Sequence, residues 1–205
     1  MEVHSYKELD ELQLDALKEI GSIGAGNAAT ALSSMIGKSV RIDSPQVRIM
    51  EYNEAIEWMG GPELITAGVL VKMSGQLKGI LLSLQQMEFV DLICEALLGH
   101  VADDYSQLGP LEHSALTEVG NIMINAYITA LCGLTGMDAK LTVPDFCVGM
   151  QGAIIAVPIA EYGGQSDYLM TIGGDFILNG KKMPCRLLLS PELNSLNTLM
   201  RKLGL

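Results

Sequence analysis

The chain has 205 residues, of which 49% are hydrophobic and 5% aromatic, and its formal net charge is −11. Its 13 Lys and Arg residues are scattered, and the densest groups are the pairs Lys181-Lys182 and Arg201-Lys202. Affinity for nucleic acid depends on clustered cations that neutralise phosphates, so this distribution disfavours a nucleic-acid partner. An acidic surface suits a partner that presents a basic face.

Neither a membrane span nor a signal peptide is predicted. The longest apolar stretch, residues 122–137, is interrupted by Asn125 and ends in a Gly-containing turn. A membrane-spanning helix needs about 20 mostly apolar residues, so a buried helix is the better interpretation. The first residues, MEVHSYKELDEL, are acidic and lack the basic-then-apolar order of a signal peptide. We therefore expect a cytoplasmic protein that does not insert into membranes.

The first half of the chain, about residues 8–99, begins with a predicted long helix over about residues 8–36. Apolar, β-branched segments between Gly and Pro then predict strands over about 39–52, 65–74 and 76–84. A shorter amphipathic helix over about 86–98 closes this half. Gly99 follows it, as is typical of a helix end, because Gly adopts the left-handed conformation cheaply.

The second half, about residues 110–205, predicts the same order of elements. The polar segment HVADDYSQLGP, residues 100–110, links the halves, and Pro110 suits the first turn of a helix. We expect a long helix over about 110–135 and a short closing helix over about 191–203. The strands between them are predicted over about 138–148, 151–159, 166–178 and 182–190.

The two halves are an internal repeat. Residues 15–47 align with residues 114–146 without a gap, at the offset of 99 that separates Glu19 from Glu118. A repeat of this kind can decide the fold. Each long helix is apolar over much of its surface and needs both a sheet and the other helix to cover it. We therefore predict one pseudo-two-fold α/β domain over residues 1–205, with the long helices on one face of a mostly antiparallel sheet. Internal duplication can replace dimerisation, which favours a monomer.

One polar face of the second long helix is the candidate site. Ser114, Glu118, Asn121 and Asn125 follow each other at spacings of four, three and four, which places them on one side of a helix. No base stands beside a nucleophile, so a Ser–His–Asp type of site is excluded. An Asn amide both accepts from and donates to a water molecule or a phosphoryl oxygen. The alternative is that the Asn residues only satisfy helix contacts and that the Glu is only solvated.

No metal site is predicted. The three histidines, His4, His100 and His113, form no metal-ligand spacing with each other or with cysteine.

The pattern Ser114-x3-Glu118-x2-Asn121, with Pro144 placed 23 positions after the Asn, resembles the signature of the CheC/CheX/FliY family of CheY-phosphate phosphatases. The strings EIGSIGAGNAATALSSMIGK and EVGNIM, the repeat and the length are most similar to the CheC type. The resemblance implies a chemotaxis phosphatase that hydrolyses the aspartyl phosphate of a CheY-like response regulator.

The resemblance also implies the roles of the residues. In that family the regulator supplies Mg²⁺ and the phosphorylated Asp, so this chain needs no cofactor of its own. Asn121 would orient the attacking water, and Glu118 would engage a Lys near the regulator's phosphorylation site. Phosphoryl transfer depends mainly on positioning and charge stabilisation, which fits a site without a nucleophile.

The first half departs from the pattern. Asp15-x3-Glu19 is present and Pro45 is in place, but Ser22 stands at the position of the Asn. A hydroxyl is shorter than an amide and lacks its donor and acceptor pair, so we expect a degenerate first site. Asn27 lies five residues on, rotated by about 140° around the helix, and is a poor replacement.

Two other functions remain open from the sequence. The chain is alternatively a non-catalytic CheC-like module that binds a response regulator or a CheD-type receptor deamidase. A structural repeat protein without a signalling role would leave the polar helix face without a purpose.

Overall fold

The computed structural model describes residues 3–101, 105, 108–162 and 168–205. Residues 102–104 and 106–107 of the predicted linker, and residues 166–167 at the start of a predicted strand, lie outside the described residues. Within the described ranges, no helix is long and apolar enough to cross a membrane.

Two helices of 26 residues each, α1 and α4, dominate the fold. The helices are α1 (Glu11–Ile36), α2 (Tyr52–Trp58), α3 (Met87–Leu98), α4 (Pro110–Thr135), α5 (Gln151–Tyr162) and α6 (Leu193–Lys202), and a short 3₁₀ helix, η1, spans Tyr6–Glu8. Asp10 caps α1 by accepting from the backbone N–H of Gln13, which explains why the helix begins later than predicted. Gly37 and Gly136 end α1 and α4 in the left-handed conformation.

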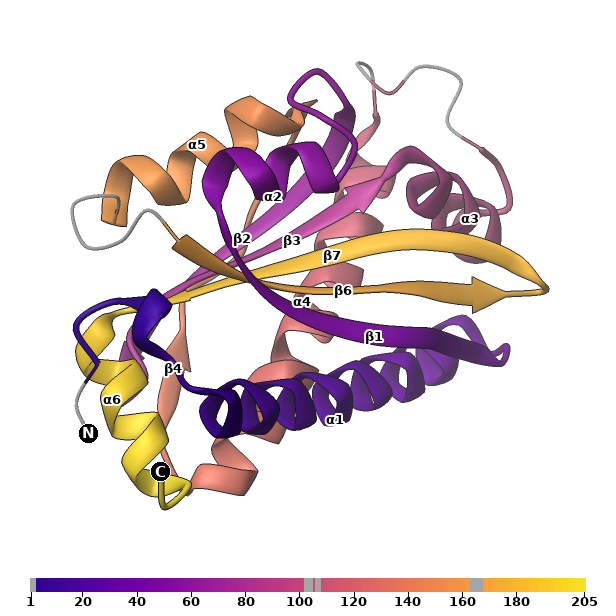
Figure 1. Cartoon of the computed structure of the whole chain (residues 1–205). Helices are drawn as coiled ribbons and strands as arrows, with labels where there is room; N and C mark the ends of the chain where they lie inside the picture. Colours follow the sequence, from indigo (N-terminus) through magenta and orange to yellow (C-terminus); the bar gives the residue numbers. More distant parts are fainter. Residues whose placement is uncertain (1–2, 102–104, 106–107, 163–167) are drawn as a thin grey trace.

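The strands form one sheet whose halves are interleaved (Figure 1). They are β1 (Val40–Glu51), β2 (Ile65–Gly75), β3 (Gly79–Gln86), β4 (Ala139–Leu141), β5 (Asp145–Met150), β6 (Tyr168–Leu178) and β7 (Lys181–Pro191). The order is β1-β6-β7-β3-β2-β4, with β5 also on β2, and every pair is antiparallel. The first strand of each half thus pairs with the second strand of the other half, while β3 and β7 pair at the centre.

Both first strands are interrupted at the same repeat position. The register of β1 on β6 shifts between Asp43 and Gln46, and β4 ends at Leu141 before β5 begins at Asp145. A proline lies in each interruption, and proline has no N–H to donate to a strand ladder. The single strand predicted over about 138–148 is therefore two strands.

Helices cover both faces of the sheet, as Figure 1 shows. The main core lies between the sheet and α1, α4, α3 and α6, and a second core lies between the sheet and α2 and α5. The predicted packing of the two long helices on one face is confirmed. The predicted helix–strands–helix order of each half is also confirmed, with one short helix added after the first strand of each.

The short helix α5 corrects the prediction of a strand over about 151–159. Its buried residues recur at helical spacing, at Gln151, Ile154, Ile155 and Pro158. The exposed positions between them are also apolar, so the sequence QGAIIAVPIA shows no periodicity and reads equally well as a buried strand. Gln151 fixes the start of α5 by donating from Nε2 to the carbonyl oxygens of Ile56 (3.3 Å) and Gly61 (3.0 Å).

The long helices touch where a glycine faces an aromatic ring. An added Cβ on Gly24 would lie 2.3 Å from Cδ1 of Tyr127, so α1 and α4 approach too closely there for any side chain on α1. Gly24, in the small-residue string GAGNAA, is therefore the point of closest approach that these contacts identify. Gly26 of the same string is exposed, and a Cβ there would meet nothing within 4 Å.

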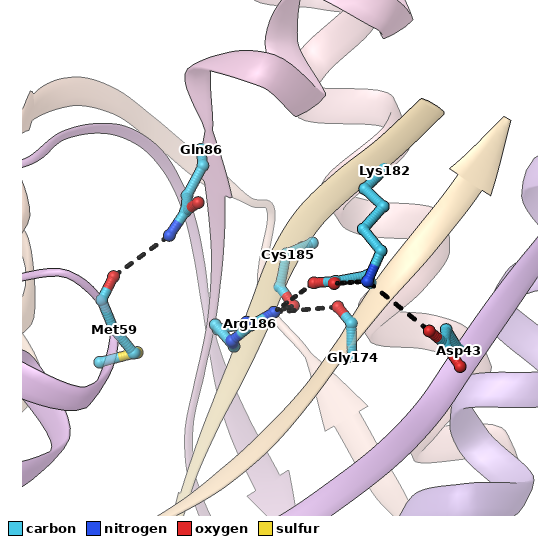
Figure 2. A network of polar contacts seen from close by, with 8 residues as sticks. Asp43, Met59, Gln86, Gly174, Lys182, Cys185 and Arg186 are labelled. Atoms are coloured by element: carbon cyan, nitrogen blue, oxygen red, sulfur yellow. Dashed lines mark hydrogen bonds and ion pairs between the residues drawn. The ribbon is translucent and has the colours of Figure 1, made fainter. Parts of the chain in front are cut away.

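A polar network on the α2 side of the sheet joins β6 and β7 (Figure 2). Arg186 donates from Nη1 to the carbonyl oxygens of Gly174 (2.9 Å) and Cys185 (3.0 Å), and the same nitrogen lies 3.6 Å from Oδ1 of Asp175. The guanidinium also lies 5.3 Å from the ring centroid of Trp58, at the end of α2. Arg186 therefore links two strands to a covering helix.

Figure 2 also shows the contacts of Lys182 and a separate hydrogen bond between Gln86 and Met59. Lys182 lies 3.0 Å from Asp175 and 3.7 Å from Asp43 of β1, and its hydrogen bond to Asp175 raises its pKa. Gln86 of β3 donates from Nε2 to the carbonyl oxygen of Met59 (3.1 Å), just after α2. The bond from Gln86 and the contact of Arg186 with Trp58 hold α2 onto the sheet, whereas Lys182 links β7 to β6 and β1.

Replacing Arg186 tests this network. We expect Arg186→Met to lower the free energy of unfolding by about 1–3 kcal/mol, because two carbonyl oxygens lose a donor and Asp175 keeps only Lys182 as a cationic partner among the described residues. Arg41→Met, on an exposed position of β1, is the matched control and should change stability by about 0.5 kcal/mol or less. Equal unfolding midpoints in urea for the two variants would contradict the role of Arg186.

Candidate functional site on α4

The polar face of α4 lies on the surface. Ser114, Glu118 and Asn125 are exposed and Asn121 is half-buried. The opposite side of the helix is buried in the main core through Leu116, Val119, Met123, Ile124, Tyr127, Ile128 and Leu131. The predicted candidate residues therefore share one accessible face, which is the geometry that a partner protein needs in order to reach them.

A glycine beside this face fixes the height of α4 above the sheet. A Cβ on Gly120 would lie 2.5 Å from Cγ2 of Val69 on β2 and 3.0 Å from Nε2 of Gln85 on β3. Gln85 also donates from Nε2 to the carbonyl oxygen of Leu116 (3.3 Å), one turn earlier. With Gly120 pressed onto the sheet, the next residue, Asn121, lies about 100° further round the helix.

The two asparagines of this face are hydrogen-bonded to each other. Asn125 donates from Nδ2 to the backbone carbonyl oxygen of Asn121 (2.8 Å) and to the side-chain oxygen Oδ1 of Asn121 (2.9 Å). The spacing predicts that the two residues are neighbours, but it does not reveal that two hydrogen bonds join them.

The start of α4 is held by a hydrogen bond between His100 and Glu112. Nε2 of His100 lies 2.6 Å from Oε1 of Glu112, in the first turn of α4. Hydrogen bonds from the backbone N–H of Glu112 itself and from His100 lower the pKa of this carboxyl. A carboxylate is favourable at a helix N-terminus, so Glu112 stabilises the turn that leads into Ser114.

The equivalent face of α1 packs on the sheet in the same way but carries different polar side chains. Asp15, Glu19 and Ser22 are exposed, and Asp15 forms an ion pair of 2.7 Å with Lys18. Like Gly120, Gly21 presses on the sheet; a Cβ there would lie 2.3 Å from Cγ2 of Val47. At the offset of 99, the counterpart of Asn125 is Gly26, so this face has neither of the two amides.

Two exposed leucines extend these faces and were not among the predicted site residues. Leu12 is 65% exposed and Leu111 is 68% exposed, each in the first turn of a long helix, one turn before Asp15 and Ser114 respectively. Single exposed leucines are common. Their separation by the repeat offset of 99 is the sequence signal that marks this pair.

No metal centre is found among the residues that the structure describes, since no three His, Cys, Asp or Glu side chains gather there. The ring of His113, beside Ser114, packs edge-on against Phe146 of β5, with 4.8 Å between the ring centroids.

Comparison with known proteins identifies relatives across the whole chain. Residues 12–49 match the model of the CheC-like family. The CheY-P phosphatase CheC of Bacillus subtilis (strain 168) is 25% identical over 203 residues, which are 97% of either protein.

Solved structures share the fold. The FliY structure from Thermotoga maritima superposes with a TM-score of 0.73 at 21% identity, over 95% of this chain and 99% of that one. A chain of the CheX–CheY–BeF3–Mg²⁺ complex from Borrelia burgdorferi superposes with a TM-score of 0.55 at 18% identity, over 83% of this chain and 96% of that one. The predicted α/β fold is thereby confirmed.

The contact between Gly120 and Val69 is tested by a double-mutant cycle. We expect Gly120→Ala to destabilise the protein by about 1–3 kcal/mol, because the new methyl forces α4 away from β2. Val69→Ala removes the opposing methyl groups, so the two changes together should cost at least about 1 kcal/mol less than their sum. Gly133→Ala, where a Cβ meets nothing within 4 Å, is the control and should be neutral or stabilising. Additive effects at Gly120 and Val69 would show that they are not in contact.

Proposed function

Since the chain belongs to the CheC-like family, we propose that it is a phosphatase that hydrolyses the aspartyl phosphate of a CheY-like response regulator at the polar face of α4. One observation carries the proposal. Ser114, Glu118 and Asn121 lie together on an accessible side of a helix that is otherwise buried and is seated on the sheet by Gly120. A rigid, accessible amide beside a carboxylate can act on a phosphoryl group that a partner brings to it.

In this proposal Asn121 orients the attacking water in line with the phosphorus. An amide donates through Nδ2 and accepts at Oδ1, so it can hold a water and contact a phosphoryl oxygen. Positioning of this kind accounts for much of phosphoryl-transfer catalysis. The regulator supplies the phosphorylated Asp and the Mg²⁺ that neutralises charge.

The role proposed for Glu118 is to bind a Lys of the regulator. Its side chain is exposed, and an exposed ion pair contributes more to the orientation of the partner and the association rate than to affinity. The strongly acidic chain adds long-range attraction to any regulator with a basic face. Ser114, one turn before Glu118, completes the polar surface that the regulator covers.

Leu111 is proposed as the apolar part of the same docking surface. It lies one turn before Ser114 and is 68% exposed. Apolar area removed from water is a main source of free energy in protein association. Leu12 offers the same contact one turn before Asp15, so the degenerate first face is proposed to dock a regulator without hydrolysing its phosphate.

The location and assembly are proposed on the same basis. A protein that acts on a CheY-like regulator works in the cytoplasm, and we propose that it does so as a monomer, because the strand exchange of a two-fold dimer is already present within one chain.

A second function, a binding module without catalysis, is favoured by one observation. The face of α1 keeps its carboxylates but has Ser22 and Gly26 where α4 has amides. The fold therefore does not require the amide pair. A chain that used both faces only to dock a regulator or a CheD-type deamidase would not require it either.

A dephosphorylation assay separates the two functions. With a phosphorylated CheY-like regulator and Mg²⁺, we expect the wild type to accelerate phosphate release and Asn121→Ala to lose about a hundredfold or more in kcat. Glu118→Ala should lose only about two- to fivefold in kcat/KM, because an exposed ion pair is worth about 1 kcal/mol or less. Asn27→Ala, on an exposed position of α1, is the matched control and should keep full activity.

Activity of Asn121→Ala equal to that of the wild type would contradict a catalytic role for this residue. A wild type that binds the phosphorylated regulator without accelerating phosphate release would identify the binding module.

The docking role of Leu111 predicts a change in KM. Leu111→Ser should raise KM about five- to tenfold with kcat nearly unchanged, because it removes apolar area that the regulator covers. Leu134→Ser is the control, since Leu134 is 49% exposed near the other end of α4. Equal KM values for the two variants would remove Leu111 from the docking surface.

A further inference from the structure

The hydrogen bonds of Asn125 determine which way two amides point. Its Nδ2 lies 2.8 Å from the backbone oxygen of Asn121, which only accepts, so a nitrogen and not an oxygen must face that position. The second N–H of the same nitrogen is then directed at the side chain of Asn121, 2.9 Å away. Only an oxygen can receive it, so Oδ1 of Asn121 faces Asn125 and its Nδ2 faces away.

We infer that Asn125 is a positioning residue for Asn121, an inference that rests on the proposed phosphatase function. The last torsion of a free Asn side chain is broad and allows the amide to turn over. The bond from Asn125 selects one orientation before a partner arrives. Both N–H groups of Asn121 and one remaining lone pair of Oδ1 are then available to a water molecule and a phosphoryl oxygen.

This ordering lowers the cost of reaching the reactive geometry. A group that is already oriented does not lose its torsional freedom in the reaction step, and misplacement by about 1 Å can cost about a hundredfold in rate. Asn125 is exposed, so water could satisfy the hydrogen-bonding groups of its amide. It therefore does not need the bond to Oδ1 of Asn121 for that purpose. The bond to Oδ1 therefore indicates a function in ordering its neighbour.

The repeat supports treating the two amides as one unit. On α1 the positions of Asn121 and Asn125 hold Ser22 and Gly26, so the amide and its support are missing together. A Cβ on Gly26 would meet nothing within 4 Å, and the residue is exposed, so a side chain can be introduced there without a clash.

The first test measures kcat, KM and the mobility of the Asn121 amide. Asn125→Ala should lower kcat between about tenfold and a hundredfold and leave KM within about twofold, since docking is retained and orientation is lost. Asn125→Asp should be at least as impaired, because a carboxylate has no N–H to donate to Asn121. Asn125→Gln keeps the donor and should recover part of the loss. Asn27→Ala is the matched control, with wild-type kcat.

Side-chain amide ¹⁵N relaxation gives a readout that does not require turnover. The order parameter of the Asn121 amide should fall in Asn125→Ala and stay high in Asn125→Gln, while thermal unfolding shows whether each variant is folded. An unchanged kcat in Asn125→Ala, or an Asn121 amide that is as mobile in the wild type as in this variant, overturns the inference.

The second test moves the unit to α1. In an Asn121→Ala background, Ser22→Asn with Gly26→Asn should restore at least about tenfold more kcat than Ser22→Asn with Gly26→Ala, which controls for the removal of a helix glycine. Equal activity of these two variants overturns the inference. If the wild type is inactive, the proposed function and this inference both fail; if it is active and Asn125→Ala is equally active, only this inference fails.

Discussion

The exchange of strands between the two halves is the constraint on which the rest of the structure depends. Strand β1 of the first half pairs with β6 of the second half, and strands β4 and β5 of the second half pair with β2 of the first half. The central strands β3 and β7 join the two halves. Neither half has a complete sheet of its own. Each long helix can therefore bury its apolar side only after both halves have assembled, and the two polar faces acquire fixed positions in the same step.

The residues that pack the long helices onto the sheet differ from the residues that form their polar faces. Gly21 and Gly120 press against β1 and β2, and any side chain at either position would meet a valine. The residues that follow them, Ser22 and Asn121, face outward and carry little of the packing. Exposed positions can differ without loss of the fold, which explains how one face can carry an amide pair and the other not, while both helices pack on the sheet in the same way.

Much of this arrangement could be predicted from the repeat, and the parts that could not have physical reasons. The spacing of apolar residues placed α4 within its true bounds, and a gapless offset implied two equivalent polar faces. The strand predicted over about 151–159 is the helix α5, because an apolar segment without polar positions carries no period. The seven-residue helix α2 was not predicted at all. Spacing also showed that Asn121 and Asn125 are neighbours, but the direction of a hydrogen bond depends on side-chain torsions that no sequence pattern encodes.

The fold alone does not separate a phosphatase from a binding module, since similar structures at low identity show only a shared architecture. The feature that discriminates between them is whether the half-buried amide of Asn121 is ordered before a partner binds. A docking surface tolerates a mobile amide, because the partner orders it on contact at a cost of about 0.5–1.5 kcal/mol. A group that must hold a water molecule in line with phosphorus reacts faster when it is ordered beforehand, because molecules with the group in any other orientation do not react. An Asn that is accessible and yet held by its helix neighbour therefore favours the proposed phosphatase over the binding module.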